Sequence, residues 1–373
     1  MDGKKLHIVS FDVPWPADYG GVIDVFHKLR HLHAQGLEII LHCFQYGRSE
    51  SELLKKFAKA VYYYPRFTGK GKLLHAQPYI VLSRKHPELT KNLSGDGAPI
   101  LFEGLHSTSC LRHPDFRNRK KIIRAHNIEH AYYRQLARSE HNYFKKAYLL
   151  SEALKLEKYE SVCREADLVA GISASDTLHF RELCDRAFLL PPFHGYDEVL
   201  AQEGRGNYFL YHGNLGVSEN EAAALWLTEE VAPQLNAELL IAGHKPGPGL
   251  RKMILKQSHV RLIESPSEDL LNQLIREAQA HLMPAFQASG VKLKLLHALF
   301  NGRHVLANRN MLAGTGLEDL CIRAESAGDF ISAANGILKT GFEKADIHKR
   351  EEVLGLKYSN RTNARRLIDQ IWP

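Results

Sequence analysis

Short apolar runs rich in β-branched and aromatic residues recur along the whole chain, with helical patterns between them, and this alternation limits the folds that are available. The first half contains LHIVSF (6–11), LEIILHCF (37–44), AVYYYP (60–65), PILFEG (99–104), KIIRA (121–125), DLVAGIS (167–173) and AFLLP (187–191). The second half contains YFLYHG (208–213), AELLIAG (237–243), VRLIE (260–264), AHLMP (280–284) and RHVLAN (303–308). Runs this short are typical of parallel strands that are covered on both faces. Their alternation with helices predicts an α/β protein with doubly wound sheets.

The length of the chain and a break in its pattern predict two domains. A chain of 373 residues exceeds one ordinary core, and the periodicity lapses at 191–207, where proline, glycine and polar residues gather. We therefore expect Rossmann-like domains over 1–192 and 206–355. A final helical segment over 356–373 follows the second domain and can pack back on the first.

Composition narrows the class of protein. Apolar residues make up 44% and charged residues 24% of the chain, which are ordinary values for a globular protein. No stretch reaches the roughly 20 apolar residues of a membrane helix, and the start shows no apolar signal core, so a cytoplasmic location is expected. Five cysteines at irregular spacing indicate free thiols rather than a disulfide framework or a zinc site.

The net charge of +7 predicts an anionic partner. A nucleotide diphosphate, nucleic acid and an acidic membrane face all fit, and charge does not choose among them. The sequence contains no recognition helix and no aromatic–basic RNA motif, so nucleic acid is not expected. Basic residues of the first half, among them Arg66, Arg84 and the run RNRKK (117–121), could instead dock on an anionic inner membrane face.

In open parallel sheets ligands bind beyond the carboxyl ends of the strands, so the residues that follow each run are candidates for the site. After the run 208–213, Gly213 and Gly216 allow close approach of the backbone, and a helix begins near Asn220. Free amides at a helix start favour a diphosphate, although a plain turn and helix cap explains the same residues. The candidate ligand-binding residues of these loops are Gly213, Asn214, Gly216, Asn220, Gly243, His244 and Lys245.

The stretch 283–308 is the most specific part of the sequence. Gly290 permits close backbone approach, and Lys292 and Lys294 lie beside it at the start of a helix that ends near Gly302. Two cations in an apolar segment favour an anion such as a diphosphate, whereas the alternative leaves both lysines in solvent. The candidate ligand-binding residues of this stretch, which the resemblance described next assigns to the donor site, are Ser289, Gly290, Val291, Lys292, Lys294 and His297.

The string SGVKLKLLHALFNGRHVLAN (289–308) resembles the donor-binding signature of family 4 retaining glycosyltransferases. The similarity covers most of the chain, because it continues in YGGVIDVFHKLRHL (19–32), HNIEHAYYRQLA (126–137), GNLGVSENEAA (213–223) and ESPSEDLLNQLIREAQA (264–280). The resemblance implies a GT-B fold, in which two Rossmann-like domains face across a cleft, a nucleoside-diphosphate sugar as donor, and no obligatory metal or cofactor. Where the family often carries two glutamates, this chain has Ser289 and His297, which can still hydrogen-bond a sugar or ribose.

The first half supplies the predicted acceptor side. The loop within 12–29 carries Trp15 and Tyr19, which can stack on a sugar ring, and Gly20-Gly21 at a helix start, which places amides near the donor or the acceptor. In the alternative interpretation, both aromatic side chains belong to the core.

Polar side chains that are costly to bury unpaired end two further runs. Glu103 lies near the end of the fourth run and His106 just after it, while Arg124 lies near the end of the fifth run and His126 just after it. These four are the candidate catalytic residues. By resemblance, His106 matches the histidine that the family puts near the transferred sugar. The resemblance also implies retention of configuration, whereas an inverting reaction would need a base that His106, His126 or Glu103 could supply.

Together these features predict a hexosyltransferase of cell-surface polysaccharide synthesis, which moves a sugar from a nucleoside-diphosphate sugar to a glycan or lipid-linked acceptor. Lys292, Lys294 and the amides near Gly216 would stabilise charge on the leaving diphosphate. Two alternatives are open: a nucleotide-sugar epimerase or hydrolase, and a nucleotide-sugar-binding protein in which Ser289 and His297 impair catalysis.

Overall fold

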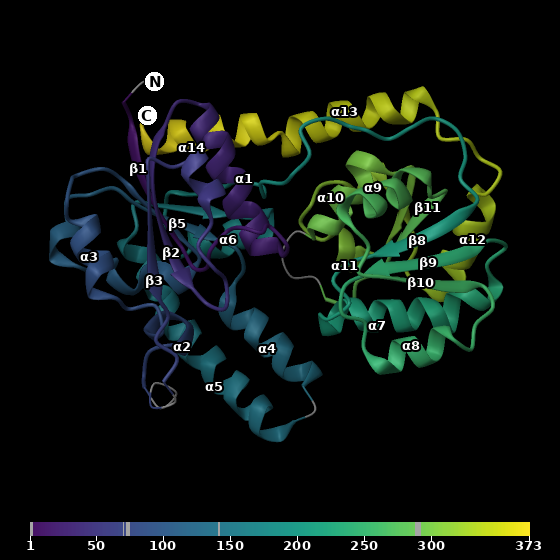
Figure 1. Cartoon of the computed structure of the whole chain (residues 1–373), viewed down its shortest axis with the longest axis horizontal. Coiled ribbons are helices and arrows are strands. Elements are labelled where there is room, and N and C mark those ends of the chain that lie inside the picture. The colour runs from purple at the N-terminus through teal and green to yellow at the C-terminus, as the bar shows by residue number, and fades with distance from the viewer. Residues whose placement is uncertain (1–2, 70, 72–74, 141, 288–291) are drawn as a thin grey trace. The chain divides into compact units, whose positions relative to one another are not determined.

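The computed structural model describes residues 3–69, 71, 75–140, 142–287 and 292–373 (Figure 1). The chain divides into two compact units, one formed by the residues up to Gly195 together with Asn360–Pro373, and the other by Tyr196–Ser359. The boundary lies inside the segment 191–207, where the sequence pattern lapses. Each unit contains one parallel sheet and its covering helices, which confirms the predicted α/β class with doubly wound sheets.

The first unit has a seven-stranded sheet in the order β3-β2-β1-β4-β5-β6-β7. Its strands are β1 (Lys5–Ser10), β2 (Glu38–Gln45), β3 (Ala60–Pro65), β4 (Ile100–Glu103), β5 (Lys121–Ala125), β6 (Leu168–Gly171) and β7 (Ala187–Leu189). Its helices are α1 (Gly20–Ala34), α2 (Tyr79–Leu82), α3 (Pro87–Leu93), α4 (Glu129–Ser139), α5 (Tyr143–Tyr159), α6 (Ala174–Arg181) and α14 (Asn360–Ile371). The strand order reverses between β1 and β4, so a ligand is expected at the carboxyl ends of these strands.

The second unit has a six-stranded sheet in the order β10-β9-β8-β11-β12-β13, which reverses between β8 and β11. Its strands are β8 (Tyr208–His212), β9 (Glu238–Gly243), β10 (Val260–Glu264), β11 (Ala280–Met283), β12 (His304–Ala307) and β13 (Ile322–Arg323). Its helices are α7 (Ser218–Trp226), α8 (Pro248–Ile254), α9 (Glu268–Glu277), α10 (Leu293–Asn301), α11 (Arg309–Leu312), α12 (Ala327–Ile337) and α13 (Lys344–Tyr358).

Helix α14 belongs to the first unit although it ends the chain. Leu367, Ile368 and Ile371 are buried in the same apolar cluster as residues of β1 and β2. At the start of the helix, Asn360 Nδ2 donates to the His194 carbonyl at 2.8 Å, and the His194 amide donates to Asn360 Oδ1 at 3.1 Å. Burial of apolar area and these paired backbone groups together hold the helix on the unit.

Helices α4 and α5 lie side by side as a helical hairpin of the first unit (Figure 1). Leu156 of α5 packs in one cluster with Ile80 and Val81 of α2. In the part of the chain that is described, no helix combines the length and the apolar character that crossing a bilayer requires.

Candidate functional site

In the second unit, the loop that joins β8 to α7 lies against the loop that follows β9. The Gly213 amide donates to the Ala242 carbonyl, and the Gly216 amide donates to the His244 carbonyl, both at 3.1 Å. A Cβ atom on Gly243 would lie 1.9 Å from the Gly213 carbonyl oxygen, so only glycine fits at this close approach. The predicted donor residues of the two loops are thus brought together at the carboxyl edge of the sheet.

Asparagine side chains shape the start of α7. Asn214 Oδ1 accepts from the Gly216 amide at 3.1 Å, and Asn220 Nδ2 donates to the Asn214 carbonyl at 2.9 Å. Val217 stands at the cap position and makes no side-chain cap, so no cap side chain occupies the first amides of the helix. Uncapped amides at a helix start carry partial positive charge and favour an anion. Lys245, which is exposed, lies beside this loop and adds a full charge.

Two lysines at the start of α10 reach toward the same loop. Lys294 Nζ donates to Asn220 Oδ1 at 2.8 Å and to Tyr211 Oη at 2.9 Å, while Lys292 Nζ lies 3.5 Å from Glu219 Oε1. Burial lowers the pKa of Lys294 to about 7, and burial also lowers the pKa of Lys292, against the opposing effect of Glu219. The hydrogen-bond partners of Lys294 are a neutral phenol and a neutral amide. The Glu219 carboxylate acts on Lys294 as well, but among the described residues no carboxylate hydrogen-bonds its Nζ, which can therefore bind an anionic ligand.

His297 lies on α10 among aromatic rings. Its Nε2 is 2.8 Å from Asn272 Oδ1 of α9, its ring stacks on Tyr196 at a centroid distance of 4.8 Å, and the His212 ring meets it edge-on at 5.3 Å. Burial lowers the pKa of His297 to about 4, so the imidazole is neutral at pH 7. Tyr196, Asn272 and His212 were not predicted from the sequence. Only His212 could have been found there, because it lies at the end of a strand. Three further predicted donor residues lie outside the described part of the chain: Ser289, Gly290 and Val291.

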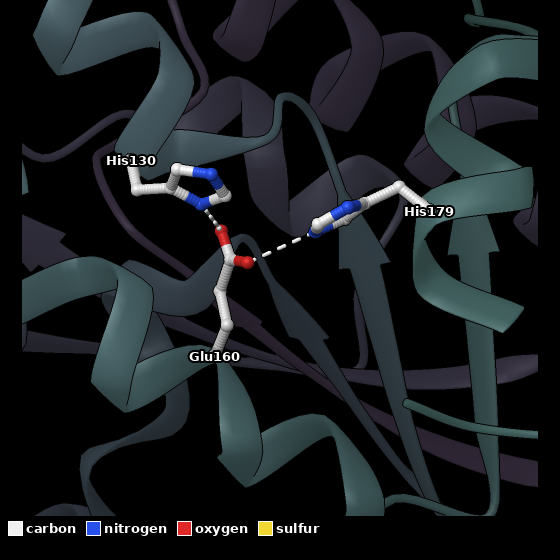
Figure 2. A group of neighbouring side chains, drawn as sticks. All are labelled: His130, Glu160 and His179. Carbon is white, nitrogen blue, oxygen red and sulfur yellow. Dashed lines mark hydrogen bonds and ion pairs between the residues drawn. The ribbon is translucent and has the colours of Figure 1, made fainter. Parts of the chain in front are cut away.

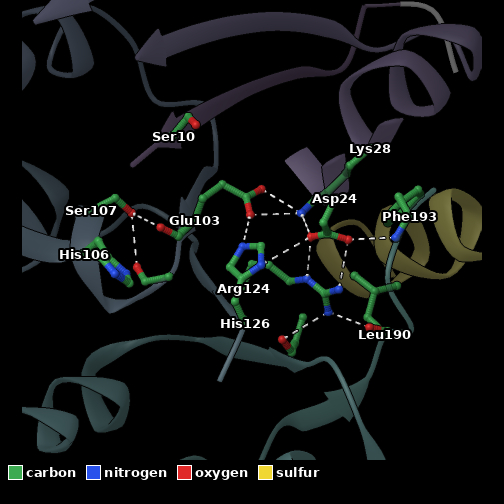
Figure 3. Close-up of polar contacts among 12 residues, drawn as sticks. Ser10, Asp24, Lys28, Glu103, His106, Ser107, Arg124, His126, Leu190 and Phe193 are labelled. Carbon is green, nitrogen blue, oxygen red and sulfur yellow. Dashed lines mark hydrogen bonds and ion pairs between the residues drawn. The ribbon is translucent and has the colours of Figure 1, made fainter. Parts of the chain in front are cut away.

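A network of charged side chains fills the interior of the first unit beside α1 (Figure 3). Asp24 accepts both Nε and Nη2 of Arg124 at 3.1 Å, and also Lys28 Nζ at 2.8 Å. Lys28 Nζ lies 2.8 Å from Glu103 Oε1, and His126 Nε2 lies 2.9 Å from Glu103 Oε2. The network therefore joins α1, β4 and β5.

Glu103 and Arg124 were predicted to be catalytic, but the structure buries both side chains completely. Burial alone would raise the pKa of Asp24, yet Arg124 and Lys28 outweigh it and hold this pKa below its ordinary value. Burial likewise opposes the charge of Glu103, and Lys28 and His126 outweigh it and lower the pKa. Because each charge already has its partner inside the network, this geometry fits a positioning role better than contact with a substrate.

His106 is the most exposed of the predicted catalytic side chains. It follows β4 after Gly104, whose φ of +68° turns the chain in a way that favours glycine. His106 Nδ1 lies 3.9 Å from Oε1 of Glu129, and neither atom has a hydrogen-bond partner among the described residues. Burial and then Arg84 lower the pKa of His106 well below its ordinary value, whereas burial and then Glu160 raise the pKa of Glu129 to about 8. At pH 7 a neutral imidazole thus lies beside a protonated carboxyl group.

The loop between β1 and α1 holds the predicted acceptor-side residues. Trp15 and Tyr19 are each 38% exposed, and the Trp15 ring also leans on Phe26 at 4.9 Å. The two aromatic side chains therefore lie at the surface. The alternative interpretation, which assigned them to the core, does not hold. Gly20 and Gly21 begin α1 without a side-chain cap, so the helix amides are open at this edge as well.

Among the described residues, two groups of side chains have the composition of a metal site. The first consists of Asp24, Glu103 and His126 and belongs to the buried network. Lys28 and Arg124 already neutralise the two carboxylates of this group at hydrogen-bonding distance. No negative charge is therefore left to attract a divalent cation.

The second group is His130, Glu160 and His179. Figure 2 shows the two imidazoles next to the Glu160 carboxylate. His130 Nδ1 lies 2.7 Å from Glu160 Oε1, and His179 Nε2 lies 2.9 Å from Glu160 Oε2. Hydrogen bonds to each oxygen account for this geometry. The Glu160 carboxylate raises the pKa of His179, and the two imidazoles overcome burial to lower the pKa of Glu160. The group therefore ties together α4, α6 and the turn that follows α5.

Comparison with known proteins bears on the fold. No protein-family model matches the sequence. A protein of Klebsiella pneumoniae, described as an uncharacterized 44.6 kDa protein in cps region, is 27% identical over 340 residues, which is 84% of either chain.

Solved structures resemble the whole chain. A mutant of S. aureus TarM in complex with fondaparinux, alpha-GlcNAc-glycerol and UDP has a TM-score of 0.67 at 11% identity and covers 99% of this chain and 100% of its own. A glycosyltransferase from Rickettsia africae has a TM-score of 0.65 at 12% identity and covers 100% and 98%. Anabaena HepE in complex with UDP and glucose has a TM-score of 0.63 at 11% identity and covers 99% of both chains. These likenesses confirm the GT-B fold. Membership of family 4 stays a prediction.

Proposed function

We propose that this protein is a hexosyltransferase that moves a sugar from a nucleoside-diphosphate sugar to a glycan or lipid-linked acceptor. The observation that carries the proposal is the position of Lys294, a half-buried amine whose hydrogen-bond partners are neutral, beside the loop that starts at Gly213. Lys292 and the uncapped amides of α7 add positive charge at the same edge. A diphosphate is the ligand whose negative charge these groups would balance.

The structural neighbours and the sequence relative support the choice of substrate. Because TarM and HepE were each solved with UDP, a UDP-linked hexose is the first donor to test. The relative in a cps region supports a role in cell-surface polysaccharide synthesis. In this proposal the protein acts in the cytoplasm and associates with the anionic inner face of the membrane, where a lipid-linked acceptor is presented.

In the proposed reaction, the bond between the anomeric carbon and the diphosphate breaks while an acceptor hydroxyl forms the new glycosidic bond. Lys292, Lys294 and the α7 amides stabilise the negative charge that develops on the leaving diphosphate, so we expect the transfer to need no metal. We expect His297 to hydrogen-bond the ribose as a neutral imidazole. From the first unit, His106 is the group that we expect to bind the sugar, with retention of configuration.

The proposal is tested by nucleotide-dependent thermal shift on the full chain. UDP is expected to raise the melting temperature of the wild type. Lys294→Met removes the ammonium group at similar volume, and it is expected to weaken UDP binding by about 1.5–3 kcal/mol, roughly 10- to 150-fold. The same variant should keep or raise the melting temperature without ligand, because a desolvated charge is removed.

Lys256→Met is the matched control, because Lys256 is an exposed lysine of the same unit. It should bind UDP like the wild type. If neither UDP nor GDP stabilises the wild type, or if Lys294→Met binds UDP as well as Lys256→Met does, the donor site is elsewhere. Incubation of a bound UDP-sugar without acceptor then separates a transferase from a hydrolase or an epimerase, since only the latter two would consume or convert it rapidly.

A further inference from the structure

Helix α5 is fixed on the first unit by one of its faces. Leu149, Ala153 and Leu156 are buried on this inward face. Glu152 is buried with them, and its Oε2 accepts the Tyr79 amide at the start of α2 at 2.7 Å. These contacts determine how the helix is oriented on the unit. None of these contacts involves the side chains of the opposite face.

That opposite face is apolar as well. Tyr143 and Phe144 are 86% and 90% exposed, and Leu150 and Leu154 are 44% and 56% exposed. Among the described aromatic side chains, the next most exposed is Tyr46 at 58%. Tyr143, Leu150 and Leu154 are spaced by two and then one helical turns, so they form a single stripe along the helix. A contiguous exposed apolar stripe marks an interaction surface.

Two lysines flank the stripe, since Lys146 lies one helical turn before Leu150 and Lys158 one turn after Leu154. Glu140 and Glu157, the acids at the surface of the hairpin, are each held in an ion pair with a neighbouring cation, at 2.6 Å and 2.7 Å. Arg138, Lys146 and Lys158 make no ion pair within the described part of the chain. The surface of the hairpin therefore carries uncompensated cations next to exposed aromatic and aliphatic side chains.

We propose that this α5 surface docks the protein on an anionic lipid bilayer. The surface consists of Tyr143, Phe144, Leu150 and Leu154, together with Lys146 and Lys158 of the same helix. Aromatic rings enter the headgroup region with their apolar bodies, and nearby lysines reach the acidic lipid headgroups. The stripe is about 16 Å long, so the helix lies along the bilayer and does not cross it.

This inference rests on the proposed function, because a lipid-linked acceptor is presented at such a surface. It also moves the docking surface away from the basic residues that the sequence suggested. Arg84 and Arg119 of that set are buried and bind backbone carbonyls, which leaves them unable to meet a membrane.

Co-sedimentation of the full chain with lipid vesicles tests the proposal. The wild type is expected to pellet with phosphatidylcholine vesicles that contain phosphatidylglycerol, and less as salt is added. Y143S/F144S is expected to reduce partitioning about tenfold or more, because the two most exposed aromatic side chains are lost. L154Q should reduce it by a smaller factor. L255Q is the matched control, since Leu255 is 87% exposed but belongs to the second unit, and it should pellet like the wild type.

UDP-dependent thermal shift is measured on the same samples, so that docking and donor binding are scored apart. Calorimetric transitions of Y143S/F144S at the wild-type temperatures show that both units are folded, and retention of the UDP shift shows that donor binding is intact. Three results would overturn the proposal: equal pelleting of Y143S/F144S and L255Q, equal binding to vesicles without phosphatidylglycerol, or light scattering that shows a dimer in the wild type and a monomer in the variant. A wild type that binds vesicles but no nucleotide would keep the docking surface and remove the proposed function.

Discussion

At the residue scale, Lys294 combines a positive charge with surroundings that disfavour it. Burial lowers its pKa to about 7, so the free protein loses the ammonium form as the pH rises through 7. If the diphosphate binds the ammonium form, the affinity of the wild type for UDP falls toward tenfold per pH unit above pH 7. Lys294→Met has no such group. Calorimetric titration should therefore find that Lys294→Met binds UDP much more weakly than the wild type at pH 6.5, and that the difference is much smaller at pH 8.5.

The comparison with Lys294→Met removes the titration of UDP itself, which affects both proteins equally. A ratio of dissociation constants that is the same at pH 6.5 and pH 8.5 would show that the ammonium group does not take part in binding.

The residues of the buried network show what could and could not be predicted from the sequence. Glu103 and Arg124 attract notice because a charged residue at the end of an apolar strand needs a partner. Asp24 and Lys28 attract none, because opposite charges four residues apart on a helix usually form a solvated pair. Only the packing of α1 against β4 and β5 shows that this pair faces inward, where Lys28 pairs with Glu103 and Asp24 pairs with Arg124. The structure thus shows that these charges are paired within a buried network, and their catalytic role stays a prediction.

At the element scale, the strands were predictable and the surfaces of the helices were not. Each predicted run coincides with a strand, since β-branched residues buried on both faces leave a continuous apolar signal. Strand β13 has two residues, Ile322 and Arg323, which is too short for any period. In α5, apolar residues occur on both sides of the helix, and its sequence does not say which side meets the unit.

Also at the element scale, Glu160 should contribute to stability in a pH-dependent way. The pKa of His179 is raised, so its contribution is present below the unfolded value near 6.5 and is lost as the pH rises through the folded pKa. The pKa of Glu160 is lowered, so its contribution is present above about 4.5 and is lost as the pH falls. Glu160→Gln should therefore lower the melting temperature most between about pH 5 and 6.5, and less at pH 8.5.

Glu157→Gln makes the same chemical change on the exposed surface of α5, where Glu157 pairs with Arg134. An exposed pair contributes little, so this control should melt close to the wild type at every pH. If Glu160→Gln lowers the melting temperature by the same amount at pH 5.5 and pH 8.5, the ionised group is not what holds α4 and α6 to the turn after α5.

At the scale of the whole molecule, the chain crosses from the first unit into the second and returns to the first through α14. Leu367 of α14 is fully buried in the core of the first unit, so Leu367→Ala should destabilise that unit by about 2–5 kcal/mol, or roughly 5–15 °C, whereas exposed Arg365→Ala should change it little. The proposed UDP site belongs to the second unit. In calorimetric scans, Leu367→Ala should therefore lower one transition and leave the UDP-dependent rise of the other intact. If UDP no longer stabilises Leu367→Ala, nucleotide binding depends on the first unit being folded, and the donor site is not contained in the second unit alone.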